Sequence, residues 1–141
     1  GASDAQTVKA LVEAESYPGV SLVIAYSHCI AHGLSDLKYG LAQQKAAVDS
    51  AYWPLFRYDP RRADKGENPL QLDSKGPKMP LADYAYKETR YRMLTKSNPE
   101  EAKRLMTLAQ ADLDRRWRAL EAMATVPAKT EPAVPPKPVN A

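Results

Sequence analysis

Residues 20–33 read "VSLVIAYSHCIAHG", and this stretch carries the two features that most constrain the chain. Its first half, residues 20–26, is a short run of apolar and partly β-branched residues, which predicts a strand buried on both faces, as in a parallel sheet. Its second half holds the single cysteine, Cys29, and both histidines of the chain, His28 and His32. The pattern therefore predicts a loop at the carboxyl end of a buried strand, where these three side chains lie together.

The sequence on both sides of this stretch predicts helices. Ser3 or Asp4 can cap a first helix, and Gln6, three residues after Ser3, has the spacing of a capping box. This helix is expected to end at the turn "YPG". Its apolar face comprises Val8, Leu11 and Val12. Gly33 breaks the chain after the loop, and Ser35 or Asp36 starts a second helix, which is expected to give the order helix, strand, helix of an α/β fold. The apolar side of the second helix comprises Leu37, Leu41, Val48 and Ala51.

The second half of the chain predicts a short hairpin and two further helices. The segments "LFRYD" and "LQLD", residues 55–59 and 70–73, are expected to pair as strands across a charged loop. Pro80 suits the first residue of a helix, and Asn98, with Glu101 three residues later, caps a long helix that ends near residue 124. The core side of the first helix comprises Leu81, Tyr84, Tyr91 and Leu94. The apolar side of the long helix comprises Ala102, Leu105, Met106, Ala109, Leu113, Leu120 and Met123, with Trp117 near its edge.

The end of the chain has a different composition. From Val126 it reads "VPAKTEPAVPPKPVNA", which has too little apolar side chain to offset the entropy lost on ordering. We therefore expect a folded part over residues 1–124 and a Pro-rich disordered tail over residues 125–141. Because the chain begins with Gly1 and enters structure almost at once, we expect it to be a fragment or a processed piece.

Charge and hydropathy exclude some classes of partner. The net charge of +3 is small and its basic residues are spread along the chain, so no nucleic-acid partner is expected, and the aromatic stretch 50–62 is interpreted as packing. No apolar run approaches the roughly 20 residues of a membrane span, and nothing at the start resembles a signal peptide. We expect no membrane partner and a cytoplasmic location. A single cysteine rules out an internal disulfide.

The chemistry of Cys29 stays open on the residues alone. Single cysteines are more often small buried hydrophobes than ligands. A nucleophile would need an imidazole close by, and a zinc site built from Cys29, His28 and His32 would still need a fourth ligand. As a ligand of an iron–sulfur cluster, one thiolate is a quarter of a Cys₄ site, and the other three would come from outside this chain.

Three stretches carry a resemblance to a known family. They are "AESYPGVSLVIAYSHCIAHG", "QQKAAVDSAYWPLFRYDPRRADKGENPLQLDSK" and "ETRYRMLTKSNPEEAKRL", in this order. Together they closely resemble the C-terminal part of pyruvate:ferredoxin (flavodoxin) oxidoreductase, over residues 3–124. The resemblance implies an α/β fold, namely the C-terminal portion of an open, mostly parallel thiamine-diphosphate-binding fold, followed by a helical extension.

The resemblance also implies a function. The family's homodimeric enzymes oxidatively decarboxylate pyruvate to acetyl-CoA and CO₂, using coenzyme A, and pass electrons through three [4Fe-4S] clusters to ferredoxin or flavodoxin. The loop matched by "SHCIAHG" holds the fourth ligand of one cluster, so the resemblance implies that Cys29 binds this cluster and that the chain holds no catalytic residue. His28 and His32 are not required ligands; their proximity suggests that they add hydrogen bonds or charge.

The remaining cofactors implied by the resemblance are thiamine diphosphate and magnesium. The family's Gly-Asp-Gly motif for them and its CxxC pair are absent from this sequence, so both cofactors are expected to be bound mainly by residues outside this chain. Alone, the chain is expected to bind no cluster and to catalyse nothing. The alternative is a non-catalytic structural or interaction module derived from the same domain, with Cys29 idle.

Overall fold

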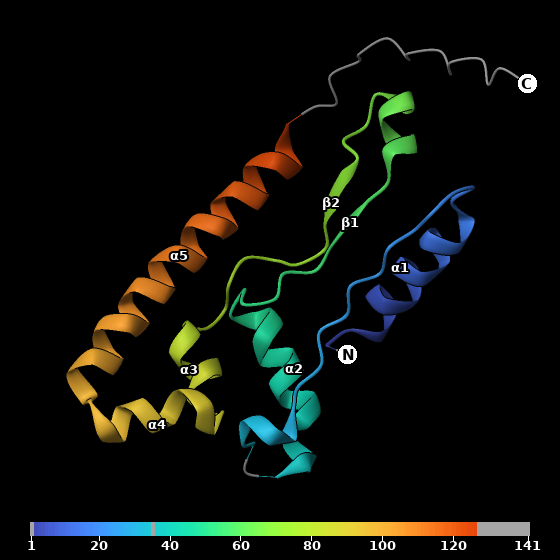
Figure 1. Ribbon diagram of the computed structural model, residues 1–141. Helices are drawn as coiled ribbons and strands as arrows, with labels where there is room; N and C mark the ends of the chain where they lie inside the picture. The colour runs from blue at the N-terminus through green and yellow to red at the C-terminus, as the bar shows by residue number, and fades with distance from the viewer. Residues whose placement is uncertain (1, 35, 127–141) are drawn as a thin grey trace, which may run out of the picture.

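The computed structural model describes residues 2–34 and 36–126, without the side chains of His32 and Leu37. Most of this part is helical, and Figure 1 shows a small two-stranded sheet between the helices. The helices are α1 (Asp4–Ser16), α2 (Gly40–Asp49), α3 (Leu81–Ala85), α4 (Thr89–Ser97) and α5 (Pro99–Thr125), and the strands are β1 (Phe56–Tyr58) and β2 (Leu70–Leu72). The predicted tail lies almost wholly outside the described residues. None of the helices described is long and apolar enough to cross a membrane.

The predicted hairpin is confirmed. β1 and β2 pair antiparallel, with Phe56 opposite Leu72. In the loop between them, Asn68 donates from its side-chain nitrogen to the carbonyl oxygens of Met123 and Val126, at 2.7 Å each. These two bonds satisfy carbonyls that the end of α5 leaves without helical partners, and they tie the hairpin to that end.

The first helix begins as predicted, but its apolar face is exposed. Oγ of Ser3 accepts a hydrogen bond from the backbone N–H of Gln6, as in a capping box. The side chain of Gln6 does not return to Ser3; it donates to Asp73, 3.1 Å away, at the end of the hairpin. The predicted face (Val8, Leu11 and Val12) is more than half exposed at each position. In the described residues, polar contacts hold α1 where we expected apolar ones.

The predicted strand over residues 20–26 is not formed. The chain is extended here (Figure 1) but makes no ladder, and Val20, Leu22 and Ile24 are 97%, 82% and 69% exposed. A strand buried in a parallel sheet needs a hydrogen-bonded neighbour along each edge. The described residues contain only the β1–β2 sheet, and this segment does not join it. The expected α/β unit is therefore absent from the described part, and its one sheet is antiparallel.

The core lies where α2, α3 and α5 meet. Its centre is formed by Ala47, Tyr84 and Leu113, which are all but inaccessible to solvent. α5 contributes Trp117, which was predicted at the edge of the apolar side but is 7% exposed, whereas Leu105 on the predicted side is 43% exposed. The indole of Trp117 has more apolar surface to bury than any aliphatic side chain of the helix, so the buried face of α5 includes Trp117 and leaves Leu105 outside it.

α2 also buries a different face from the one predicted. Leu41 is 69% exposed and Val48 half-buried, whereas Ala51, just beyond the helix, is buried as expected. The buried side instead comprises Gly40, Gln43, Gln44, Ala46 and Ala47. The small alanines on this side let the backbone of α2 approach α3 closely, which longer side chains would prevent.

The helix predicted from Pro80 is divided in two. Pro80 is the N-cap of α3, and a turn before α4 interrupts the helix. Glu88 in this turn is 2% exposed, accepting from the amide of Gln43 at 3.0 Å and from Nε of Arg90 at 2.6 Å. The amide of Gln43 and the guanidinium of Arg90 offset the cost of burying the carboxylate of Glu88. The predicted core residues Leu81 and Tyr84 are buried, and Tyr91 and Leu94 are half-buried.

The rotated face of α5 can be tested by substitution. Trp117→Ala should lower the free energy of unfolding by about 3–5 kcal/mol, because it removes a large buried side chain and leaves a cavity. Leu105→Ala, the matched control on the predicted side, should cost about 0.5 kcal/mol or less. Urea unfolding followed by circular dichroism measures both. A larger loss for Leu105→Ala would contradict the observed orientation of the helix.

Candidate functional site

Cys29 stands on the surface in front of a tight turn. Its thiol is free and exposed, and its backbone is extended, with φ −131° and ψ 127°. The next residues, Ile30–His32, form one 3₁₀ turn, closed by a bond from the N–H of Gly33 to the carbonyl of Ile30 at 2.9 Å. This is the loop that the sequence predicted after residue 26, although no strand leads into it.

Side chains alternate along the segment that leads to Cys29. Tyr26 and His28 are half-buried, whereas Ser27 and Cys29 are exposed. In an extended backbone successive side chains point to opposite faces. One face of the segment therefore lies against the folded part of the chain, and the other presents the thiol to its surroundings.

Tyr26 is the first anchor of this segment. Its hydroxyl lies 2.8 Å from the hydroxyl of Tyr84, and its ring packs against Tyr52 and Trp53, with centroids 6.2 and 5.6 Å away. Burial raises the pKa of Tyr26 and, more strongly, that of Tyr84. Both phenols thus stay neutral at physiological pH, and their hydroxyls form an uncharged hydrogen bond.

His28 is the second anchor. Nε2 of Gln44 lies 2.9 Å from Nδ1 of His28, and because an amide nitrogen only donates, Nδ1 accepts. The imidazole rests on Gly40, the first residue of α2, where a Cβ atom would come within 2.3 Å of its Nε2. Gly40 therefore leaves the space that the ring occupies.

Gly33 is the third anchor, at the far end of the loop. Its carbonyl accepts from the hydroxyl of Thr89 at 2.8 Å and from the backbone N–H of the same residue at 3.2 Å. Gly33 has φ +79°, and a Cβ there would lie 2.4 Å from Thr89, so both backbone conformation and space require glycine. The sequence predicted this break in the chain, but not its contact with α4.

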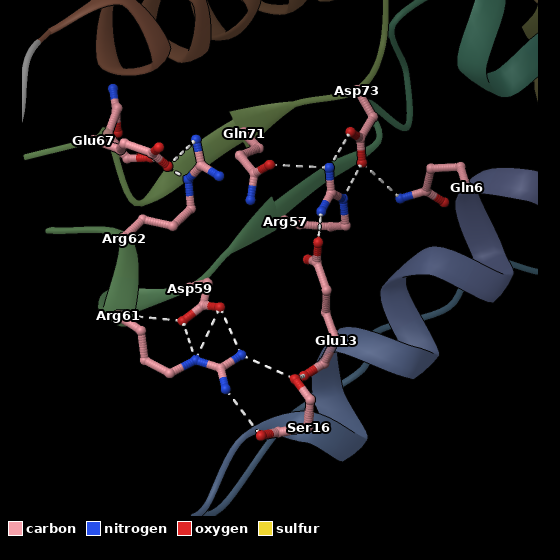
Figure 2. Close-up of polar contacts among 11 residues, drawn as sticks. Gln6, Glu13, Ser16, Arg57, Asp59, Arg61, Arg62, Glu67, Gln71 and Asp73 are labelled. Carbon is pink, nitrogen blue, oxygen red and sulfur yellow. Dashed lines mark hydrogen bonds and ion pairs between the residues drawn. The ribbon is translucent and has the colours of Figure 1, made fainter. Parts of the chain in front are cut away.

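The other end of the extended segment starts from α1, which ion pairs hold to the hairpin (Figure 2). The guanidinium of Arg57 in β1 is almost fully buried and donates to both carboxylate oxygens of Asp73, at 2.7 and 2.8 Å. It also pairs with Glu13 of α1. Burial alone would raise the pKa of Asp73, but the bonds from Arg57 and Gln6 outweigh it and lower this pKa.

Arg61 fixes the end of α1. It pairs with Asp59 and also donates to the carbonyl and hydroxyl of Ser16, at 2.9 and 3.0 Å (Figure 2). Ser16 is the last residue of α1. The start of the extended segment is therefore held by Arg61, and its end by the three anchors of the Cys29 loop.

The described residues fit only part of a metal site. They contain no group of three His, Cys, Asp or Glu side chains that could hold a metal ion. His28 lies on the face opposite Cys29 and its Nδ1 is already paired, so the geometry does not support it as a second zinc ligand or as the base of a cysteine nucleophile. The side chain of His32 lies outside the described part. The arrangement thus offers one thiol, which suits one position of a larger site.

Three residues that position the loop were missed by the sequence analysis. They are Gly40, Gln44 and Thr89, and each acts on the loop across a long sequence separation. The pair Gln43–Gln44 in an alanine-rich segment could have indicated buried amides, but the sequence did not indicate that His28 is the partner of Gln44. Nothing in the sequence indicated that Thr89 binds the carbonyl of Gly33.

The pKa of Asp73 yields a test of the contacts that hold α1. A carboxylate whose pKa is lowered by folding stabilises the folded state at pH values above its ordinary pKa, about 4. This contribution to stability is lost as the pH falls through the pKa of the carboxylate in the folded state. Asp73→Asn should therefore lower the free energy of unfolding by about 3 kcal/mol at pH 7, and much less at pH 2. Urea titrations at the two pH values measure it, with Asp36→Asn at an exposed ion pair as control. An equal loss of unfolding free energy at both pH values would contradict the lowered pKa of Asp73.

Comparison with known proteins finds similarity to segments of pyruvate oxidoreductases. No protein-family model matches it. It is 55% identical over 124 residues to a putative pyruvate-flavodoxin oxidoreductase of Synechocystis, and 47% identical over 133 residues to a pyruvate-flavodoxin oxidoreductase of Rhodospirillum rubrum. It is 44% identical over 124 residues to the pyruvate:ferredoxin oxidoreductase of Moorella thermoacetica.

These alignments cover most of this chain but little of each relative. They span 88%, 94% and 88% of this chain, and 10%, 11% and 10% of the respective relatives. The chain thus spans about one tenth of the length of the curated relatives it matches. Over that length, it is homologous to a segment of the pyruvate-flavodoxin and pyruvate:ferredoxin oxidoreductase family.

Proposed function

We propose that the chain is part of an oxidoreductase that oxidatively decarboxylates pyruvate to acetyl-CoA and CO₂, and that Cys29 is one ligand of a [4Fe-4S] cluster in it. The observation that carries the proposal is the exposed, unpaired thiol on a segment anchored from its opposite face. The relatives support it, since those at 44–55% identity bear the names of pyruvate-flavodoxin and pyruvate:ferredoxin oxidoreductases.

Cys29 has the properties of a ligand supplied to a shared site. A cluster of this type takes four thiolates and, when bound, accepts and releases electrons singly. Cys29 supplies one thiolate; the other three come from residues beyond those described. The N–H groups of the 3₁₀ turn that follows Cys29 are also placed to donate to cluster sulfurs, because the first donors of such a turn have no partner within it.

The other components of the reaction belong to the same proposal. Thiamine diphosphate and magnesium are bound mainly by residues outside this chain, and pyruvate, coenzyme A and the electron acceptor, ferredoxin or flavodoxin, bind the whole enzyme, which is a homodimer. In the proposal, the main role of the residues described here is to carry the cluster ligand. They present Cys29 and pack the segment that carries it.

The proposal also gives residues 20–26 a role. In the longer enzyme they form a strand of an open, mostly parallel sheet, beside strands contributed by other parts of the protein. The extended backbone, the missing ladder and the exposure of Val20, Leu22 and Ile24 support this, since such an apolar edge is suited to adding strands.

Hydrogen exchange tests the strand. In the full-length enzyme the backbone N–H groups of residues 21–25 should exchange at least about 100-fold more slowly than in this chain alone, since ladder bonds open only on local unfolding. Mass spectrometry of peptides from both proteins measures the difference. The exposed loop at Gly76 serves as the control segment and should exchange rapidly in both. Equally fast exchange of residues 21–25 in the two proteins would contradict the proposed sheet.

Substitution of Cys29 tests the ligand. In the full-length enzyme, purified without oxygen, Cys29→Ala should lower the iron content by about one third and abolish pyruvate-dependent ferredoxin reduction, because a Cys₄ site lacking one thiolate is labile. Ser27→Ala is the matched control, since Ser27 is exposed on the same face two residues earlier. Iron analysis and electron paramagnetic resonance measure both variants. Unchanged iron in Cys29→Ala would favour a structural module with an idle cysteine.

A further inference from the structure

We propose that His28 is a positioning residue for the cluster: seated on Gly40 and held by Gln44, it sets the direction in which Cys29 presents its thiolate. This inference rests on the proposed function, because it assumes that Cys29 is a ligand. It assigns His28 an indirect role, with its ring turned toward α2 and away from the cluster.

Side chains alternate between two faces along the segment that carries His28 and Cys29. Because His28 and Cys29 are neighbours in an extended segment, fixing the ring of one on α2 directs the side chain of the other outward. Tyr26 makes a similar contact two residues earlier, through Tyr84. Without His28, the described residues between Tyr26 and Gly33 would have no side-chain hydrogen bond to the helices, and the thiol could turn with the backbone.

Gln44 and Gly40 form the position that the ring of His28 occupies. Gln44 is 9% exposed, and its Oε1 is buried without a hydrogen-bond partner in the described part of the chain. Leaving an amide oxygen unpaired costs stability. An aliphatic residue would avoid this cost, so the amide is explained by its bond to Nδ1 of His28. Gly40 adds a second requirement, since any side chain there would collide with the imidazole.

The test uses the full-length enzyme, purified without oxygen, and follows the cluster itself. In His28→Leu the contact with Gln44 is lost, and in Gly40→Ala the added Cβ displaces the ring. Both variants should release the iron of one cluster to a chelator about tenfold faster than the parent enzyme, the usual effect of removing a residue that orients a metal ligand. The electron paramagnetic resonance signal of that cluster alone should also change.

Two further variants separate positioning from general loss of structure. His28→Asn keeps a side-chain oxygen that can accept from Gln44, and should restore most of the chelation rate and the signal. Gly76→Ala is the matched glycine control, because a Cβ there meets nothing within 4 Å, and it should behave as the parent.

The outcomes separate this inference from the proposed function. If Cys29→Ala loses its cluster but His28→Leu and Gly40→Ala keep the parent's chelation rate and signal, the inference is wrong and the ligand assignment stands. If Cys29→Ala retains all of its iron, both are wrong. Faster release in His28→Leu that His28→Asn fails to reverse would also overturn the positioning role, since it would not depend on the bond to Gln44.

Discussion

The hydroxyl of Tyr84 lies in a fully buried position, where a polar group needs a hydrogen-bond partner, and the hydroxyl of Tyr26 supplies one at 2.8 Å. This bond connects the extended segment to the core. The ring of Tyr84 stacks on the ring of Tyr52, with centroids 4.6 Å apart, and the backbone carbonyl of Tyr84 accepts a hydrogen bond from the side chain of Gln43 at 3.2 Å. α2, α3 and the segment before Cys29 therefore meet at one residue.

The position of Cys29 follows from this contact and from two others. His28 fixes the segment on α2, and the carbonyl of Gly33 fixes the end of the loop on Thr89. Between them the backbone has little freedom, while the thiol remains exposed. A ligand held in this way needs little reordering when a cluster binds, which is the usual benefit of a site supported by its neighbours.

Local signals in the sequence predicted local structure well. The caps at Ser3 and Asn98 and the pairing of the two hairpin strands depend on residues close together, and all are confirmed. The buried faces of α2 and α5 were predicted only in part: Ala51, Ala102 and Leu113 are buried as expected, whereas Leu41 and Leu105 are exposed. These faces depend on partners distant in sequence, such as the contact of Gln43 with Glu88. The strand over residues 20–26 needs neighbouring strands that the described residues do not contain. The anchors of Cys29 were missed for the same reason, whereas Cys29 itself was chosen from its loop and from the resemblance.

On the proposed function, the thiol of Cys29 binds iron in the complete enzyme. A structure of the full-length protein, prepared without oxygen, tests this most directly. We expect continuous density from Sγ of Cys29 to one iron atom of a [4Fe-4S] cluster, with the ring of His28 on Gly40 behind it. A cluster held by four other ligands, with the thiol of Cys29 free, would contradict the account.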